Sequence, residues 1–223
     1  MGKRSVVTRR QFLKLTGFAV GAGALGSGGS FARLVRAADV VFPEYSFGGE
    51  TVVRGRILVA YASKCGSSAG VAKAIGEVLH EKGAAVDVRL AKKVGDISSY
   101  QAVIDGSAIR MGKWLPEATS FVEAHREVLG HIPVEYFLVC YSMRDPSEEN
   151  RQEALSYLKP LRDAVPEVRP VDAGLFAGAV DYSKLSWIFK RVLKKKGLQE
   201  GDFRDWDAIR SWAAGVAPRL LRV

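Results

Sequence analysis

The chain has 223 residues, of which 48% are hydrophobic and only two are cysteines. This composition excludes a disulfide-stapled miniprotein, a collagen-like repeat and a disordered chain, and it predicts one catalytic-sized domain with a proper core. Lysine and arginine total 33 against 24 acids, but seven of the basic residues and none of the acids lie in residues 1–37. The rest of the chain carries a net charge of only +2, which argues against a nucleic-acid partner.

Residues 1–37 are typical of a targeting segment. A basic start is followed by an uncharged, glycine-rich stretch, Leu15–Ala32, and by small residues that a signal peptidase could cleave after Ala37 or Ala38. The segment Thr8–Lys14, with sequence TRRQFLK, resembles a twin-arginine export signal at every position. We therefore expect a periplasmic or otherwise exported protein that crosses the membrane already folded, as proteins with a cytoplasmically inserted cofactor do. The alternative is an uncleaved leader that tethers the chain to the membrane, although its glycines disfavour a spanning helix.

Residues 38–55 have no sustained hydrophobic period and are predicted to be a linker, so that residues 56–223 form the domain. In the domain, short β-branched runs alternate with stretches of helical period, which predicts an α/β fold with a doubly wound, mostly parallel sheet of five strands. The expected strands are Arg56–Tyr61, Ala85–Leu90, Gln101–Gly106, Val134–Tyr141 and Val171–Ala177. The expected helices lie around Val71–Leu79, Phe121–Leu129, Ala154–Leu161 and Lys184–Lys196, with a last helix capped by Asp205.

The loop after the first strand carries the strongest binding signal in the domain. Its hydroxyls, its glycine and the free N–H groups of the following helix form an anion cradle. The loop matches neither the nucleoside-triphosphate nor the dinucleotide glycine pattern, so a terminal monophosphate suits it better than ATP or NAD. The residues expected to form this cradle are Ser63, Lys64, Cys65, Gly66, Ser67 and Ser68. The alternative is an ordinary turn in which Ser67 caps the helix.

Two further loops should meet the first at the carboxyl edge of the sheet, where doubly wound sheets bind ligands. The second loop contains Ser107, Ala108, Ile109, Arg110, Met111, Gly112, Lys113 and Trp114, and the third contains Tyr141, Ser142, Met143 and Arg144. Trp114 and Tyr141 are the aromatic residues placed to sandwich a flat cofactor, or alternatively to cover the core.

Together with Phe176–Ala179, Tyr182, Trp187 and the helix that starts at Asp205-Trp206, these loops resemble the flavodoxin-like family. Within it they look like the menaquinone-dependent protoporphyrinogen dehydrogenases and related flavodoxin-domain proteins. The resemblance covers Arg56 to Ala217 and implies five parallel strands in the order 2-1-3-4-5. It also implies an FMN whose phosphate the first loop holds, a quinone or protein redox partner, and a porphyrinogen-like substrate. Cys65 stands where flavodoxins usually place threonine, and Lys64 adds a charge that those loops commonly lack.

Cations near the flavin separate two functional classes. Arg110, Lys113 and Arg144 would favour the anionic reduced flavin and raise its potential, which favours an exported FMN-dependent oxidoreductase over a low-potential carrier. Alternatively they are solvated loop cations. An electron-transfer protein that docks on a redox partner remains the second class, and a flavin-free binding module with the same fold is the third.

The remaining signals concern the membrane, metals and disulfides. The basic helix Lys184–Lys196 either makes a peripheral membrane contact or packs on the core with its last-turn lysines complementing the helix dipole. His80, His125 and His131 lack the spacing of metal ligands, so no metal centre is expected. Cys65 and Cys140 lie at the ends of the first and fourth strands. In the expected order these two strands are two positions apart in the sheet, and the distance of about 10 Å between them is beyond the reach of a disulfide.

Overall fold

A computed structural model of the chain describes residues 40–48, 55–185, 187–195 and 197–221. The expected leader, with its export signal and cleavage site, lies outside the described residues, as does part of the expected linker.

Five parallel strands form the body of the sheet. Their order is β3-β2-β4-β6-β7, which confirms the expected order 2-1-3-4-5. The strands are β2 (Arg56–Ala62), β3 (Ala85–Leu90), β4 (Tyr100–Arg110), β6 (Val134–Val139) and β7 (Ala173–Phe176). They are mostly apolar on both faces, as expected where helices cover both sides of a doubly wound sheet.

Two short antiparallel strands were not expected. β1 (Tyr45–Phe47) pairs with β3 and extends the sheet at its edge. The expected linker is therefore partly wrong, because residues 45–47 belong to the domain. β5 (Lys113–Trp114) folds back on β4 through the turn Met111-Gly112, in which both residues have positive φ, 55° and 73°. Two such residues are what a two-residue hairpin requires.

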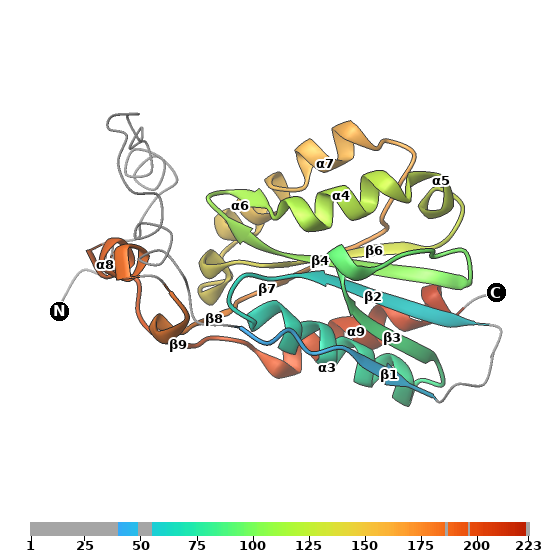
Figure 1. Cartoon of the computed structure of the whole chain (residues 1–223), viewed down its shortest axis with the longest axis horizontal. Coiled ribbons are helices and arrows are strands. Elements are labelled where there is room, and N and C mark those ends of the chain that lie inside the picture. The colour runs from blue at the N-terminus through green and yellow to red at the C-terminus, as the bar shows by residue number, and fades with distance from the viewer. Residues whose placement is uncertain (1–39, 49–54, 186, 196, 222–223) are drawn as a thin grey trace, which may run out of the picture.

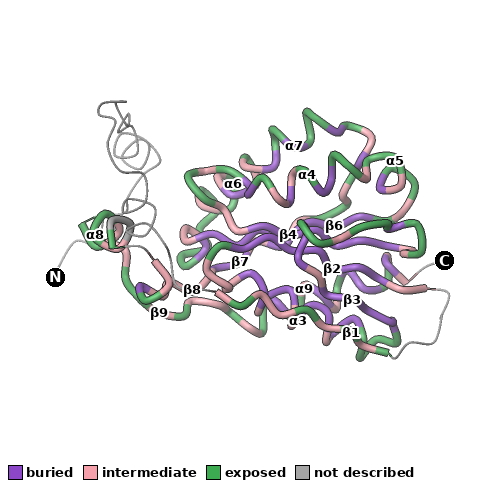
Figure 2. Tube along the Cα trace, in the orientation of Figure 1, coloured by how far each residue is buried: buried purple, intermediate pink, exposed green. Residues whose placement is uncertain are grey.

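Helices form a layer on each face of the sheet (Figure 1). α3 (Ser67–Glu81) and α9 (Trp206–Leu220) cover one face, and Asp205 caps α9 as predicted, accepting from the Ala208 amide. The other face carries α4 (Pro116–Ala124), α5 (Arg126–Leu129), α6 (Glu148–Ser156) and α7 (Lys159–Ala164). The core consequently lies in two halves, one on each side of the strands, and Figure 2 shows the buried strands between the partly exposed helices.

An arm of the chain extends beyond the carboxyl ends of the strands, between β7 and α9 (Figure 1). It contains the hairpin of β8 (Ala179–Val180) and β9 (Gly201–Asp202), the turn η3 (Tyr182–Lys184) and the helix α8 (Trp187–Lys195). None of the described side chains of α8 is buried, and Lys190 and Lys194 lie over the ring of Tyr182. The described side chains of this helix therefore do not support the alternative in which it packs on the core.

Candidate functional site

The first loop is shaped by Gly66, which lies directly before α3. Gly66 has a left-handed backbone with φ of 87°, and its amide donates to Ser63 Oγ at 3.0 Å. It is also the N-cap residue of α3, and no side chain bonds to the first amides of that helix in the manner of a cap. The alternative in which Ser67 caps the helix is therefore wrong. The first N–H groups of α3 are free of side-chain caps, as an anion site requires.

Two observations test whether the loop fits a phosphate. Ser68 Oγ is fully buried and has no hydrogen-bond partner among the described residues, and a buried hydroxyl without a partner is costly. Gly66 lets the backbone take a conformation that a larger residue adopts only with strain. A terminal phosphate fits this loop, because it could supply the missing acceptor and approach the bare backbone.

Lys64, which was expected in the cradle, is already engaged in an ion pair. Its ammonium group is paired with Glu117, which α4 presents from the opposite side of the loop. Although burial alone would raise the pKa of Glu117, the bond from Lys64 lowers it. The ion pair therefore ties the loop to α4, and Glu117 offsets the positive charge that Lys64 brings to the loop.

Charges from two other segments converge on Cys65, the half-buried thiol of the loop. Burial raises the pKa of Cys65, and the positive charges of Arg110 and Lys184 oppose that rise, while Asp181 adds to it. Arg110 comes from the end of β4, and Lys184 comes from the arm. Lys184 was not predicted as a site residue. The sequence feature that could have pointed to it is the length of the connection between β7 and α9. This connection is far longer than the usual loop of about 2–6 residues.

The second predicted loop is largely regular structure. Ser107, Ala108, Ile109 and Arg110 continue β4, and Met111 and Gly112 form the turn to Lys113 and Trp114. Ser107 is fully buried, accepts from the Leu115 amide at 2.9 Å and donates to the Ala108 carbonyl. The hairpin forms because Ile109 and Trp114 make a cross-strand pair. As a result Arg110, Met111 and Lys113 are exposed at its tip.

Trp114 cannot frame a flavin as predicted. Its side chain is only 7% exposed and packs edge-on against Tyr136 in the core, with ring centroids 5.2 Å apart. Its indole Nε1 is buried without a partner among the described residues. The hairpin pairing turns the ring toward the sheet, so the alternative in which Trp114 covers the core is confirmed.

The third loop, Tyr141–Arg144, is a single turn after β6, and it fastens the arm. The Arg144 guanidinium lies 4.8 Å from the centre of the Tyr141 ring and donates to Tyr141 Oη at 2.7 Å and to Gln199 at 3.2 Å. Met143 is buried, and Ser142 Oγ donates to Cys140 Sγ at 3.6 Å. Tyr141 is half-buried and remains the aromatic side chain that a flavin could reach. Arg144 acts mainly as a clamp between this loop and the arm.

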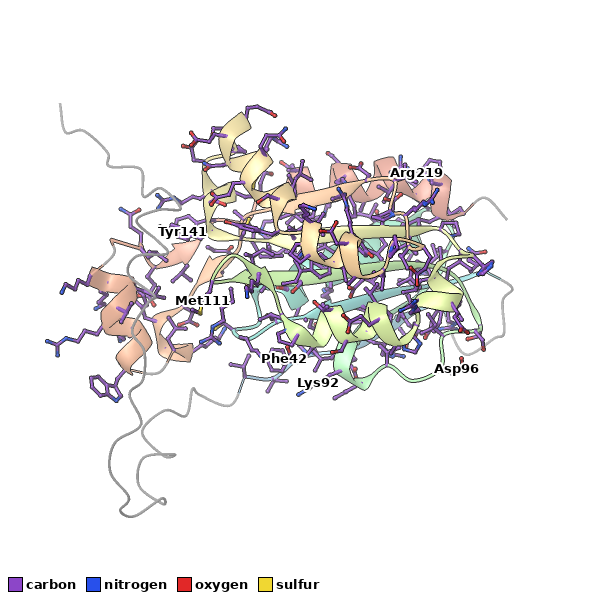
Figure 3. All side chains as sticks on the ribbon, turned by 90° about the horizontal axis from the view of Figure 1, so that it is seen from above. Phe42, Lys92, Asp96, Met111, Tyr141 and Arg219 are labelled. Carbon is purple, nitrogen blue, oxygen red and sulfur yellow. The ribbon has the colours of Figure 1, made fainter. Side chains whose placement is uncertain are left out.

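Two clefts open beside the first loop. One, of about 300 Å³, is lined by Ser63, Lys64, Phe42 and Glu117 among others. The second, of about 480 Å³, is lined by Gly66, Ser183, Lys184 and Arg204 among others. Figure 3 shows Met111 and Tyr141 at the end of the sheet that α8 adjoins, with Asp96 and Arg219 at the opposite end. The predicted loops thus meet at one end, which is the carboxyl edge of the sheet.

Metal ions and disulfides have no geometric basis in the described part of the chain. No group of three histidine, cysteine or acidic side chains there could hold a metal ion. Cys65 and Cys140 are both free thiols. None of the described helices combines the length and apolar character needed to cross a bilayer.

A doubly wound sheet with a phosphate-shaped loop at its switch point defines a nucleotide-binding α/β protein of the kind that carries a mononucleotide. The chain belongs to the flavodoxin-domain family, whose model matches residues 58–205. Membership implies FMN as the cofactor and a role in electron transfer to redox partners. No protein of curated function matches the sequence significantly.

Solved structures similar to the chain include three flavodoxins. An archaeal flavodoxin is 15% identical with a TM-score of 0.48, covering 75% of this chain and 99% of its own. A flavodoxin from Pseudomonas aeruginosa is 14% identical with a TM-score of 0.48, covering 74% and 98%. Oxidised flavodoxin 2 from Bacillus cereus is 21% identical with a TM-score of 0.41, covering 64% and 99%.

The residues that would hold FMN follow from this geometry. Ser63, Gly66, Ser67 and Ser68 would take the phosphate, with Arg110 and Lys184 as the nearby cations. Tyr141 would face the ring. When bound, FMN supplies a centre that accepts two electrons from one partner and delivers them to another.

Proposed function

We propose that the chain is an exported FMN-dependent oxidoreductase that takes electrons from an organic substrate of porphyrinogen type and passes them to a quinone. In this reaction the substrate loses two electrons and two protons, and the quinone gains them to become a quinol. The observation that carries the proposal is the placement of two cations beside the phosphate loop. Arg110 ends β4, and Lys184, which is ion-paired with Asp181 at 3.3 Å, lines the cleft that also contains Gly66. Positive charge near the cofactor stabilises its anionic reduced form, so the site is suited to accepting electrons from an organic donor.

The exposed helix α8 supports a quinone as the acceptor. Its described side chains include the cations Lys190, Arg191, Lys194 and Lys195, and Trp187 is 54% exposed. A basic helix with an exposed aromatic residue suits an anionic lipid surface, in which a quinone would be dissolved. The alternative, an electron-transfer protein that docks on a redox partner, would use the same cations to bind an acidic protein surface.

One experiment separates these two functions. Mature protein should purify with a flavin spectrum and release FMN, identified by its mass. After anaerobic photoreduction, it should be reoxidised by a menaquinone analogue in anionic vesicles faster than in zwitterionic vesicles. The double variant Arg191→Glu, Lys195→Glu should lose that difference while keeping its FMN. Reoxidation by soluble redox proteins but not by quinone vesicles would favour the carrier, and a colourless protein that fails to bind added FMN would contradict the cofactor.

Export by the twin-arginine route is part of the proposal and rests on residues 8–14. Replacing Arg9 and Arg10 together with lysine should leave unprocessed precursor in the cytoplasm, because that route reads the arginine pair itself. Cell fractionation and immunoblotting measure the outcome, and Lys3→Arg with Arg4→Lys is a control that keeps the charge and leaves the motif intact. Mature protein outside the cytoplasm despite the double change would show that the motif is incidental.

A further inference from the structure

Residues 40–47 are fastened to the domain as an N-terminal strap. Its second half is β1, which pairs with β3 at the sheet edge. The Arg89 guanidinium donates to the Tyr45 carbonyl at 2.8 Å and to Ser46 Oγ at 2.7 Å, and Ser46 Oγ in turn donates to Asp87 at 2.6 Å. The strap is therefore held in place by backbone pairing and by a cluster of polar side chains.

The first half of the strap is held by β2, the strand that carries the phosphate loop, and by the end of β3. Tyr61 Oη, one residue before the end of β2, donates to the Pro43 carbonyl at 2.7 Å. The Leu90 amide donates to Glu44 at 3.2 Å. Burial raises the pKa of Tyr61 to about 12, so its phenol keeps the donated proton across the pH range in which the protein works. The strap and the loop thus share an anchor.

Beyond this anchor, Val40 lies across the phosphate loop. Its Cγ1 is 3.4 Å from the point that a Cβ on Gly66 would occupy. Val40 lines the 300 Å³ cleft and also the 480 Å³ cleft, so it separates two openings that flank the same loop. Phe42 covers the Ser63 and Lys64 side.

We propose that this strap closes over the phosphate end of the cofactor site and retains FMN in it. The proposal rests on FMN being the cofactor of the first loop. A ligand enclosed beneath a docked segment leaves only after the segment undocks, so docking of the strap slows release and ligand binding stabilises the strap. The expected leader ends two or three residues before Val40, so cleavage after Ala37 or Ala38 would leave the strap complete.

Two variants and a matched control test the strap. Val40→Ala removes the side chain that crosses Gly66, whereas Val41→Ala makes the same change at a neighbouring residue that is 82% exposed. Tyr61→Phe removes the anchoring bond to Pro43 and keeps the buried ring. From the usual worth of one hydrogen bond, Tyr61→Phe should speed FMN release about three- to tenfold. Val40→Ala should also speed it, and Val41→Ala should not. The release rate is read from the fluorescence gained when FMN-loaded protein is diluted far below its dissociation constant, so that released FMN stays free in solution.

Hydrogen exchange supplies a second readout. The amides of residues 40–47 should exchange more slowly in FMN-loaded protein than in the apoprotein, and Tyr61→Phe should reduce that protection. Equal release rates in wild type, Val40→Ala and Tyr61→Phe, together with exchange that FMN does not change, would overturn the strap while leaving the cofactor in place. Wild type that takes up no FMN would overturn both the cofactor and the strap. If Tyr61→Phe fails to fold, the comparison of FMN release rates between Val40→Ala and Val41→Ala still tests the strap, because Val40 is half-exposed.

Discussion

Replacing Asp105 with asparagine should raise the free energy of unfolding by up to about 4 kcal/mol at pH 7 and should flatten its dependence on pH. Asp105 is fully buried on the central strand β4, opposite Ala60 of β2 and Tyr136 of β6. Neither of its carboxyl oxygens has a well-formed hydrogen bond among the described residues. Burial holds the pKa of Asp105 well above its usual value, and the Gly106 amide opposes this only weakly.

The sign follows from proton binding. Below a pH of about 4 the carboxyl is protonated in both the native and the unfolded chain, so it adds no pH-dependent cost. At higher pH the unfolded chain loses the proton while the native chain keeps it. Stability therefore falls by about 1.4 kcal/mol per pH unit until the raised native pKa is reached. Asparagine has nearly the same shape and no proton to lose, so the contribution of this position to the slope should disappear.

Urea unfolding of both proteins between pH 4.5 and 8 measures this difference. Asp145→Asn is a suitable control, because Asp145 is exposed, and its change should stay within about 0.5 kcal/mol at every pH. Parallel curves for wild type and Asp105→Asn would mean that the native carboxyl is not held neutral.

Gly66→Val should reduce FMN affinity by more than about a hundredfold, while Gly83→Val should leave it unchanged. These two glycines lie at opposite ends of α3 and both have a left-handed backbone, with φ of 87° and 98°. A β-branched residue is strained at either position, which should cost each variant similar stability. A side chain at Gly66, however, would also stand beside Val40 and where the phosphate must approach the backbone, whereas nothing lies within 4 Å of one at Gly83.

Fluorescence quenching on FMN titration gives the two affinities, and thermal unfolding confirms that both variants are folded to the same extent. Gly83→Val thereby separates the backbone strain from the site itself. Wild-type affinity in folded Gly66→Val would place the phosphate elsewhere on the domain.

Local patterns in the sequence determined the fold class and the strands, and they indicated the loop after β2 as the candidate phosphate site. Alternating β-branched runs and helical periods are local properties that a parallel sheet imposes along the chain, so β2, β3 and the helix face of Val71, Ile75 and Leu79 could be predicted directly. The glycine and serines after β2 likewise carry their signal in consecutive residues. Asp205 capping α9 is predictable for the same reason.

Tertiary pairing decided what each site residue does. Trp114 was expected to face a ligand, but the hairpin register with Ile109 turns it into the core. The ring that it packs against, Tyr136, lies on β6, which only the folded sheet brings alongside β4. Lys64 was expected at the phosphate, but it forms an ion pair with Glu117, which lies 53 positions further along the chain. Lys184 and Val40 reach the loop from the two ends of the domain, and only the folded sheet brings such distant segments together.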